Sequence, residues 1–177
     1  MFGRVVEVTG QGASARLTVA VQLVRQAQER GEVVAWIGAK NAMFFPPDLA
    51  EHGVDLDAVV VVRVDDANAM FQATDHLLRS GAFGLVVVDL EGRRYDVPMA
   101  VQVRLLNLTK AHDAALLLLF EETGGSLASL RAHAQRERRT VTSEGRRFHV
   151  TLRVQKDKHV GHPWEHEQAF RGPLGLG

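Results

Sequence analysis

The chain has 177 residues, with 21 Lys/Arg, 21 Asp/Glu, a formal net charge of zero and no cysteine. Its length suits a single domain over residues 1–177 with a sizeable core. The lack of cysteine excludes disulfides and thiolate metal sites and is compatible with a reducing cytoplasm. No apolar run approaches the roughly 20 residues that span a bilayer, and no signal peptide is evident. We therefore expect a cytoplasmic protein with no membrane partner.

The charges are unevenly spread. Residues 1–92 contain 7 Lys/Arg and 12 Asp/Glu, whereas residues 93–177 contain 14 and 9. A basic second half can face phosphates or an acidic partner, or can be an ordinary solvated surface. Its best candidate basic patch comprises Arg136, Arg138, Arg139, Arg146 and Arg147. Only Phe148 adds an aromatic ring nearby, so the pattern predicts weak or no DNA binding.

The first predicted elements are a strand, a glycine-rich bend and a helix. Residues 4–9 are largely apolar, and residues 17–30 carry apolar side chains at helical spacing until Gly31. Free backbone N–H groups and the helix dipole converge at such a bend, which is the arrangement that binds phosphate. The order of elements therefore predicts the scaffold of a nucleotide site.

The loop lacks the chemistry of that site. Against the pattern G-x-x-x-x-G-K-[ST], Gly10 fits, but Ala15, Arg16 and Leu17 replace the second glycine, the lysine and the hydroxyl. Leucine cannot ligate Mg²⁺, and a Cβ at Ala15 hinders the backbone from wrapping phosphates. The vestigial loop residues are Gly10, Gly12, Ser14, Arg16 and Thr18.

A dinucleotide fingerprint is an alternative interpretation of the same loop. Gly10, Gly12 and Ala15 fit G-x-G-x-x-A. That motif needs a carboxylate at the end of the next strand, but residues 33–37 are followed by Gly-Ala and then Lys40. A tight turn that packs a helix on a sheet explains the same glycines.

The remaining elements alternate in type. The patterns predict a short helix around 48–52, strands over 58–64, 84–89 and 115–120, and helices from Asp65 or Asp66 to Ser80 and over 98–112. This alternation predicts an α/β fold, a mostly parallel sheet flanked by helices.

The pattern changes after residue 121. We expect a short helical stretch around 126–130, and then period-two strands in which 148–155 pairs back on 136–141 as a hairpin. Residues 164–170 can add one more strand. The sequence thus predicts an antiparallel extension of the sheet over about 131–171.

A histidine-rich segment lies near the end of the sequence. His159, His162 and His166 lie near Glu165 and Glu167, at spacings that fit one helix face. A glycine and a proline interrupt any such helix, and no second cluster completes a tetrahedral site. We expect a surface loop and no bound metal.

The order of these elements resembles the ATPase core of RecA-type recombinases over nearly the whole chain. The matching segments are residues 3–10, 53–57, 79–82, 85–89 and 116–120, followed by Lys156-Asp157-Lys158. The resemblance implies a RecA-like P-loop core. It also aligns Lys156 and Lys158 with a pair that reaches the neighbouring protomer's nucleotide in RecA filaments.

The departures from RecA fall on the functional positions. Arg16 and Leu17 replace the phosphate-binding lysine and the magnesium-ligating hydroxyl. The catalytic glutamate of the family falls on Lys40, which cannot act as a general base unless strongly desolvated. The glutamine that senses the γ-phosphate falls on Glu121, and of the metal-binding acids only Asp89, the vestigial Walker B residue, remains. The resemblance therefore predicts no catalytic residue, no cofactor and no enzymatic activity.

A RecA-like core with these losses, and with both DNA-binding loops shortened to 91–97 and 122–125, looks like ImuA. Proteins of the ImuA type are RecA-related accessory proteins of bacterial mutagenic translesion synthesis. The resemblance implies a non-catalytic adaptor whose partners are an ImuB-type inactive polymerase, an error-prone polymerase and RecA, with self-association also open. A divergent P-loop ATPase that uses Arg16 as a phosphate clamp, or a DNA-binding RecA-family protein, are the alternatives. The chain starts almost at its first strand, so we expect a piece of a longer protein.

Overall fold

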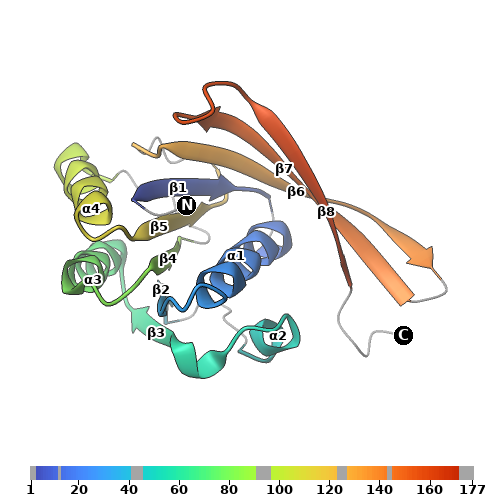
Figure 1. Cartoon of the computed structure of the whole chain (residues 1–177), viewed down its shortest axis with the longest axis horizontal. Coiled ribbons are helices and arrows are strands. Elements are labelled where there is room, and N and C mark those ends of the chain that lie inside the picture. Colours follow the sequence, from blue (N-terminus) through green and yellow to red (C-terminus); the bar gives the residue numbers. More distant parts are fainter. Residues whose placement is uncertain are drawn as a thin grey trace.

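A computed structural model describes residues 3–11, 13–40, 46–90, 97–122, 127–142 and 145–171. In these ranges eight strands form one sheet of order β3-β2-β4-β5-β1-β6-β7-β8, with helices on both faces (Figure 1). The strands are β1 (Arg4–Thr9), β2 (Val34–Ala39), β3 (Val59–Val64), β4 (Leu85–Asp89), β5 (Ala115–Phe120), β6 (Leu130–Thr142), β7 (Gly145–Asp157) and β8 (Trp164–Arg171). The helices are α1 (Ala13–Gln28), α2 (Pro46–Glu51), α3 (Ala67–Ser80) and α4 (Met99–Ala111), with a 3-10 turn at Leu56–Ala58.

The first five strands pair in parallel, as the alternation of elements predicted. Every residue of β4 and β5 is buried, which explains why their sequences are continuous apolar runs rather than alternating ones. Each face of the sheet carries its own apolar core. The predicted α/β class with a mostly parallel sheet is confirmed.

Helix α1 covers one face, and helices α3 and α4 cover the other (Figure 1). The stripe predicted on α1 is buried at Ala20, Val24 and Ala27. Helix α3 begins where the sequence predicted, after Asp66, whose carboxylate caps the helix by accepting a hydrogen bond from the backbone N–H of Ala69 at 2.8 Å. The helix ends at Gly81, whose φ of 67° is left-handed.

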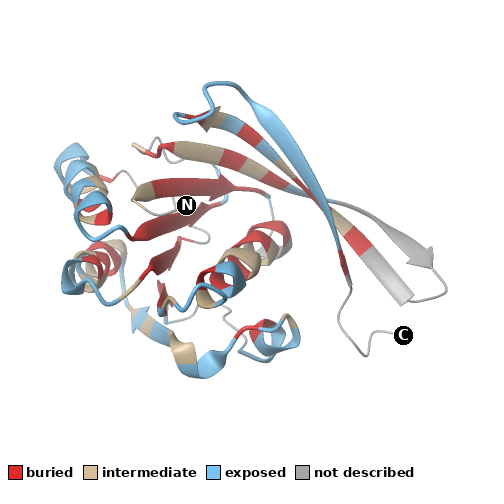
Figure 2. Cartoon of the chain, in the orientation of Figure 1, coloured by how far each residue is buried: buried red, intermediate tan, exposed pale blue. Residues whose placement is uncertain are grey.

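The last three strands extend the sheet beyond β1. Strand β6 pairs in parallel with β1 from Leu130 to His133, continues past the end of β1, and pairs antiparallel with β7. Strand β8 adds an antiparallel edge and is exposed over most of its length (Figure 2). The predicted hairpin and the final strand are both confirmed, although β6 itself is parallel to its neighbour β1.

The helix expected around 126–130 is wrong for the described residues 127–130. Residues 127–129 are not helical, and Leu130 opens β6. Both the N–H and the side-chain hydroxyl of Ser129 bond to the carbonyl of Val5, at 2.9 and 3.1 Å. Contacts to a strand far away in sequence therefore override the weak local preference for a helix.

None of the helices in the described ranges is long and apolar enough to cross a membrane.

Candidate functional site

The residues that the sequence singled out around the loop lie at one edge of the sheet. Gly10 follows β1, Lys40 follows β2, Asp89 ends β4 and Glu121 follows β5. Strands β1, β4 and β5 end at the same level in the pairing register. Because all of them are parallel, their carboxyl ends share this edge, and α1 begins there too. This is where a nucleotide site of an open α/β sheet is built.

Gly10, at the start of the loop, packs closely against β6 and against Arg16. A Cβ built on Gly10 would lie 2.5 Å from the carbonyl oxygen of Ala134 on β6, and 3.3 Å from Cγ of Arg16. The Arg16 side chain therefore passes beside Gly10 and is only 1% exposed, and Ala15 is 2% exposed. The position of the phosphate-binding lysine thus holds a guanidinium that is inside the protein.

Of the other vestigial loop residues, Thr18 is half-buried on α1. Gly12 lies outside the described residues. Ser14 belongs to α1, and its side chain is likewise outside the described part.

The position of the catalytic glutamate holds an exposed ion pair. Nζ of Lys40 lies 2.8 Å from Asp65, and both side chains are well exposed. The backbone N–H of Lys40 bonds to Val64, so the pair bridges the ends of β2 and β3. Glu121 is exposed at the same edge. The edge therefore carries the ion pair of Lys40 with Asp65. The position of the γ-phosphate sensor holds the carboxylate of Glu121.

Asp89 is buried at the end of β4, 4% exposed. Residues of a strand alternate between faces, so Asp89 lies on the same face as Val87, which packs in the core under α1. Arg16 comes from α1, so the two charged groups share this face. Among the described residues no group of three His, Asp or Glu side chains is placed to hold a metal ion.

The strand order excludes the dinucleotide interpretation. In a dinucleotide-binding fold, of order 3-2-1-4-5-6, the first strand neighbours the second. Here β4 and β5 lie between β1 and β2, and β1 is flanked by β5 and β6. The end of β2, where the ribose carboxylate would be needed, is Ala39 followed by Lys40.

The two lysines near the end of the chain lie at the opposite edge. Strand β7 ends at Asp157, which pairs with Leu130 beside the start of β1. The backbone N–H of Lys158 bonds to Ser129 at 2.9 Å. Lys156 is half-buried and Lys158 is exposed. We call residues 156–161 the dilysine turn, and its position at the amino edge separates it from the loop of its own chain.

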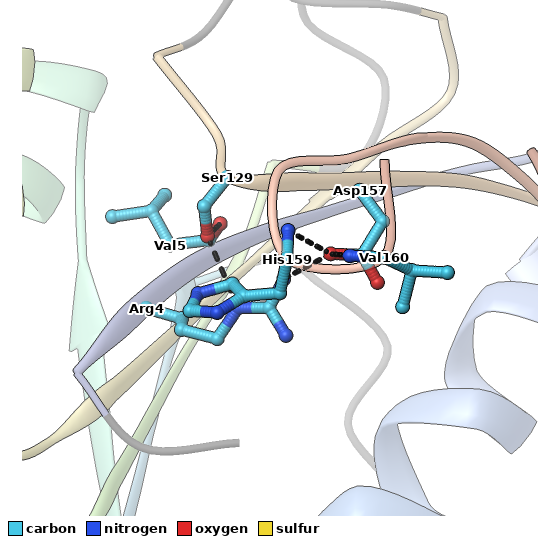
Figure 3. A network of polar contacts seen from close by, with 6 residues as sticks. All are labelled: Arg4, Val5, Ser129, Asp157, His159 and Val160. Carbon is cyan, nitrogen blue, oxygen red and sulfur yellow. Dashed lines mark hydrogen bonds and ion pairs between the residues drawn. The ribbon is translucent and has the colours of Figure 1, made fainter. Parts of the chain in front are cut away.

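Sequence reasoning assigned no role to Asp157, which lies between the two lysines. Its carboxylate accepts a hydrogen bond from Nη2 of Arg4 at 2.6 Å and another from the backbone N–H of His159 at 2.9 Å (Figure 3). These bonds hold the pKa of Asp157 at about 2, although burial acts to raise it. The hydrogen bond from the His159 N–H has the largest effect on this pKa. No local signal identifies the pair, because its partners lie at opposite ends of the chain.

The predicted basic patch lies along the outer part of the β6–β7 ribbon. The guanidinium of Arg136 is centred 4.0 Å from the Phe148 ring centroid. Phe148 is 6% exposed and stacks on Phe170, with ring centroids 5.6 Å apart. Its ring is therefore part of the apolar core on the α1 face and is not available to stack on nucleic-acid bases. The other members, Arg138, Arg139, Arg146 and Arg147, lie in β6 and β7, and their side chains are outside the described part.

The histidine-rich segment is not a helix. His166 lies on β8 between Glu165 and Glu167, so its side chain is on the opposite face from theirs. Glu165 pairs with Arg153 at 3.0 Å, and Glu167 with His149 at 2.7 Å. Alternation along the strand thus separates the side chains that the sequence spacing had grouped.

A strand–loop–helix unit on a sheet of this order, extended by an antiparallel ribbon, defines a RecA-like α/β core. The chain belongs to the RecA N-terminal domain family, which it matches over residues 1–102.

Known relatives agree with this assignment. Protein RecA of a Nocardioides species is 38% identical over 116 residues, which cover 59% of this chain and 33% of the relative. Protein RecA of Corynebacterium diphtheriae is 36% identical over 116 residues and 31% of its length. The chain therefore matches about a third of the length of these relatives. The crystal structure of the RadB recombinase shares the fold, with a TM-score of 0.68 at 16% identity over 94% of this chain and 86% of that one.

Proposed function

We propose that this chain is a non-catalytic RecA-like accessory protein of DNA damage tolerance, of the ImuA type that its sequence resembles. It acts in mutagenic translesion synthesis in the cytoplasm, through contacts with RecA, an ImuB-type inactive polymerase and an error-prone polymerase. The observation that carries the proposal is the buried guanidinium of Arg16, with Leu17 next to it, where an ATPase of this fold needs a lysine and a hydroxyl.

Three features oppose ATP hydrolysis. A guanidinium that is 1% exposed presents no donor to an incoming phosphate unless it first leaves the core. Leu17 offers no oxygen to Mg²⁺. Lys40 is held in an ion pair with Asp65 and supplies no carboxylate at the position of the family's general base. Each of these features is expected to slow or prevent hydrolysis, and together they support a chain without ATPase activity.

Titration with Mg²⁺-ATP and a phosphate-release assay test this part of the proposal. We expect no saturable binding and no release above background, with Protein RecA of the Nocardioides species assayed alongside as the active control. Phosphate release that disappears in Arg16→Ala would instead establish the divergent ATPase that uses Arg16 as its clamp.

A core that has lost catalysis is kept for its shape or its surfaces, and the dilysine turn is the surface that we propose for RecA. Lys156 and Lys158 lie at the edge opposite their own loop, which supports a contact with a nucleotide on another protomer. The chain would dock on an ATP-loaded RecA protomer, offer no nucleotide in return, and so stop filament growth. Each lysine–phosphate contact contributes about 1.5–3 kcal/mol as a charge-assisted bond.

A pull-down on RecA filaments, assembled on single-stranded DNA with a slowly hydrolysed ATP analogue, tests this surface. We expect Lys156→Ala/Lys158→Ala to bind at least tenfold more weakly than the wild type. Lys110→Ala is the matched control, since Lys110 is exposed on α4, and should bind like the wild type. Equal recovery of the double variant would show that the lysines are not the interface. Self-association through the same turn would appear as a concentration-dependent mass that the double variant lacks.

A further inference from the structure

We infer that Asp157 is a positioning residue for the dilysine turn, and that Arg4 holds it in place. This inference rests on the proposed docking of Lys156 and Lys158 to an ATP-loaded RecA protomer. The role is distinct from that of the lysines, because Asp157 is buried and its side chain is not itself accessible to a partner.

One carboxylate oxygen closes the turn. Oδ1 of Asp157 accepts the backbone N–H of His159 at 2.9 Å and, more weakly, that of Val160 at 3.5 Å (Figure 3). The backbone N–H of Gly161 donates a hydrogen bond to the carbonyl of Asp157 at 2.9 Å. Lys158 lies inside this closed turn, so the path of its backbone is set by the side chain of its neighbour.

The same oxygen ties the turn to the start of the sheet. Nη2 of Arg4 lies 2.6 Å from Oδ1 of Asp157, and Nε of Arg4 lies 3.4 Å from the hydroxyl of Ser129. That hydroxyl donates to the carbonyl of Val5, and the Ser129 carbonyl accepts the N–H of Lys158 at 2.9 Å. Three segments far apart in sequence, at Arg4, Ser129 and Asp157, are thereby joined at one corner (Figure 3).

The pairing also sets the charge that the turn presents. The Asp157 side chain is 3% exposed and its ion pair is with Arg4, itself 16% exposed, rather than with Lys156 or Lys158. The negative charge of Asp157 is thus balanced by Arg4 inside the protein. The flanking ammonium groups keep their charge for a phosphate outside it. A carboxylate released from Arg4 would lie free between the two lysines and weaken their attraction for an anion.

The experiment is a mutant cycle in the RecA filament pull-down with the full chain. Asp157→Ala should weaken docking about tenfold or more, because the turn loses its closing acceptor. Asp157→Asn should stay within about threefold of the wild type, because its amide oxygen still accepts the His159 N–H. In a Lys156→Ala/Lys158→Ala background, Asp157→Ala should add less than a twofold loss, since a residue that acts through the lysines has nothing left to position.

The outcomes distinguish the proposed lysine interface from the positioning role of Asp157. Wild-type docking by Asp157→Ala, with docking lost in Lys156→Ala/Lys158→Ala, overturns the inference and leaves the proposed function standing. A full additional loss in the double-variant background also overturns it, because it shows a role unrelated to the lysines. Wild-type docking by the lysine variant overturns the proposed interface and the inference with it.

A third variant of Asp157 separates a loss of docking from a loss of folding. Asp157→Glu keeps the charge but places the carboxylate one methylene further out, where it cannot serve both Arg4 and the His159 N–H. We expect it to lose docking as the alanine variant does, while circular dichroism and urea unfolding confirm a folded chain. Unchanged docking by Asp157→Glu would show that only the charge matters, and would overturn the positioning role.

Discussion

Gly10 packs against the backbone of Ala134, so closely that a Cβ on Gly10 would lie 2.5 Å from the Ala134 carbonyl oxygen. The obstacle is backbone of the neighbouring strand β6 and not the end of a flexible side chain. The first glycine of the vestigial loop is therefore required by the packing of the sheet itself. Its presence needs no bound phosphate to explain it.

We expect Gly10→Ala to lower the free energy of unfolding by about 3 kcal/mol, as overpacking against a rigid neighbour does. Urea unfolding followed by circular dichroism measures the loss. Gly161→Ala is the control: its φ is +83°, but nothing lies within 4 Å of the added methyl group. It should cost only the roughly 1 kcal/mol of a left-handed alanine. Equal losses in the two variants would contradict the contact with Ala134.

The buried carboxylate of Glu7 supplies a second prediction. Glu7 is completely buried on β1, and Nε of Arg131 on β6 lies 3.2 Å from its Oε1. Removing one partner of a buried pair leaves the other charge uncompensated, so Glu7→Ala should destabilise the fold by about 3 kcal/mol. Glu29→Ala breaks the exposed pair between Arg25 of α1 and Glu29, the residue after the helix, and should cost no more than about 0.5 kcal/mol. Thermal and urea unfolding of both variants make the comparison; similar losses would contradict the buried role of Glu7.

Asp157 makes stability depend on pH in a defined window. Its folded pKa of about 2 lies below the ordinary value of 3.8, through the His159 N–H and Arg4. The charged form therefore contributes stability above pH 4, and this contribution is lost as the pH falls from about 4 to 2. Over that window the wild type should lose about 1–2 kcal/mol more than Asp157→Asn, which does not titrate. Urea unfolding at a series of pH values measures the difference, and parallel curves would show that the pair adds nothing.

Single-stranded DNA should bind weakly and without sequence preference. The resemblance puts the DNA-binding loops of RecA at the connections from β4 to α4 and from β5 to β6, which here are only residues 90–98 and 121–129. Phe148 is buried and stacks on Phe170. Phosphate contacts by the arginines of the ribbon would then supply nearly all the affinity, so it should fall steeply with salt. Fluorescence anisotropy with a labelled oligonucleotide, at about 0.05 and 0.2 M salt, tests this. Nanomolar affinity at the higher salt would reveal a site that neither the patch nor the loops account for.

The sequence alone predicted most of the elements and the departures from the phosphate-loop pattern. Apolar runs and helical spacing are local properties, so they predicted the parallel strands, the stripe on α1 and the hairpin of β6 and β7. The Asp66 cap and the Gly81 stop of α3 act within a few residues of the chain. Ala15, Arg16 and Leu17 depart from the phosphate-loop pattern by residue type alone.

Only the tertiary structure decided the order of the strands and the state of the charged groups. The place of β1 between β5 and β6, which excludes a dinucleotide fold, depends on pairing between distant segments. So do the burial of Arg16, the packing of Phe148 and the contact of Ser129 with Val5 that replaced the predicted helix. Arg4 and Asp157 show the reason most plainly. Each looks like an ordinary charged residue in its own segment, and only the closing of the sheet brings them within 2.6 Å.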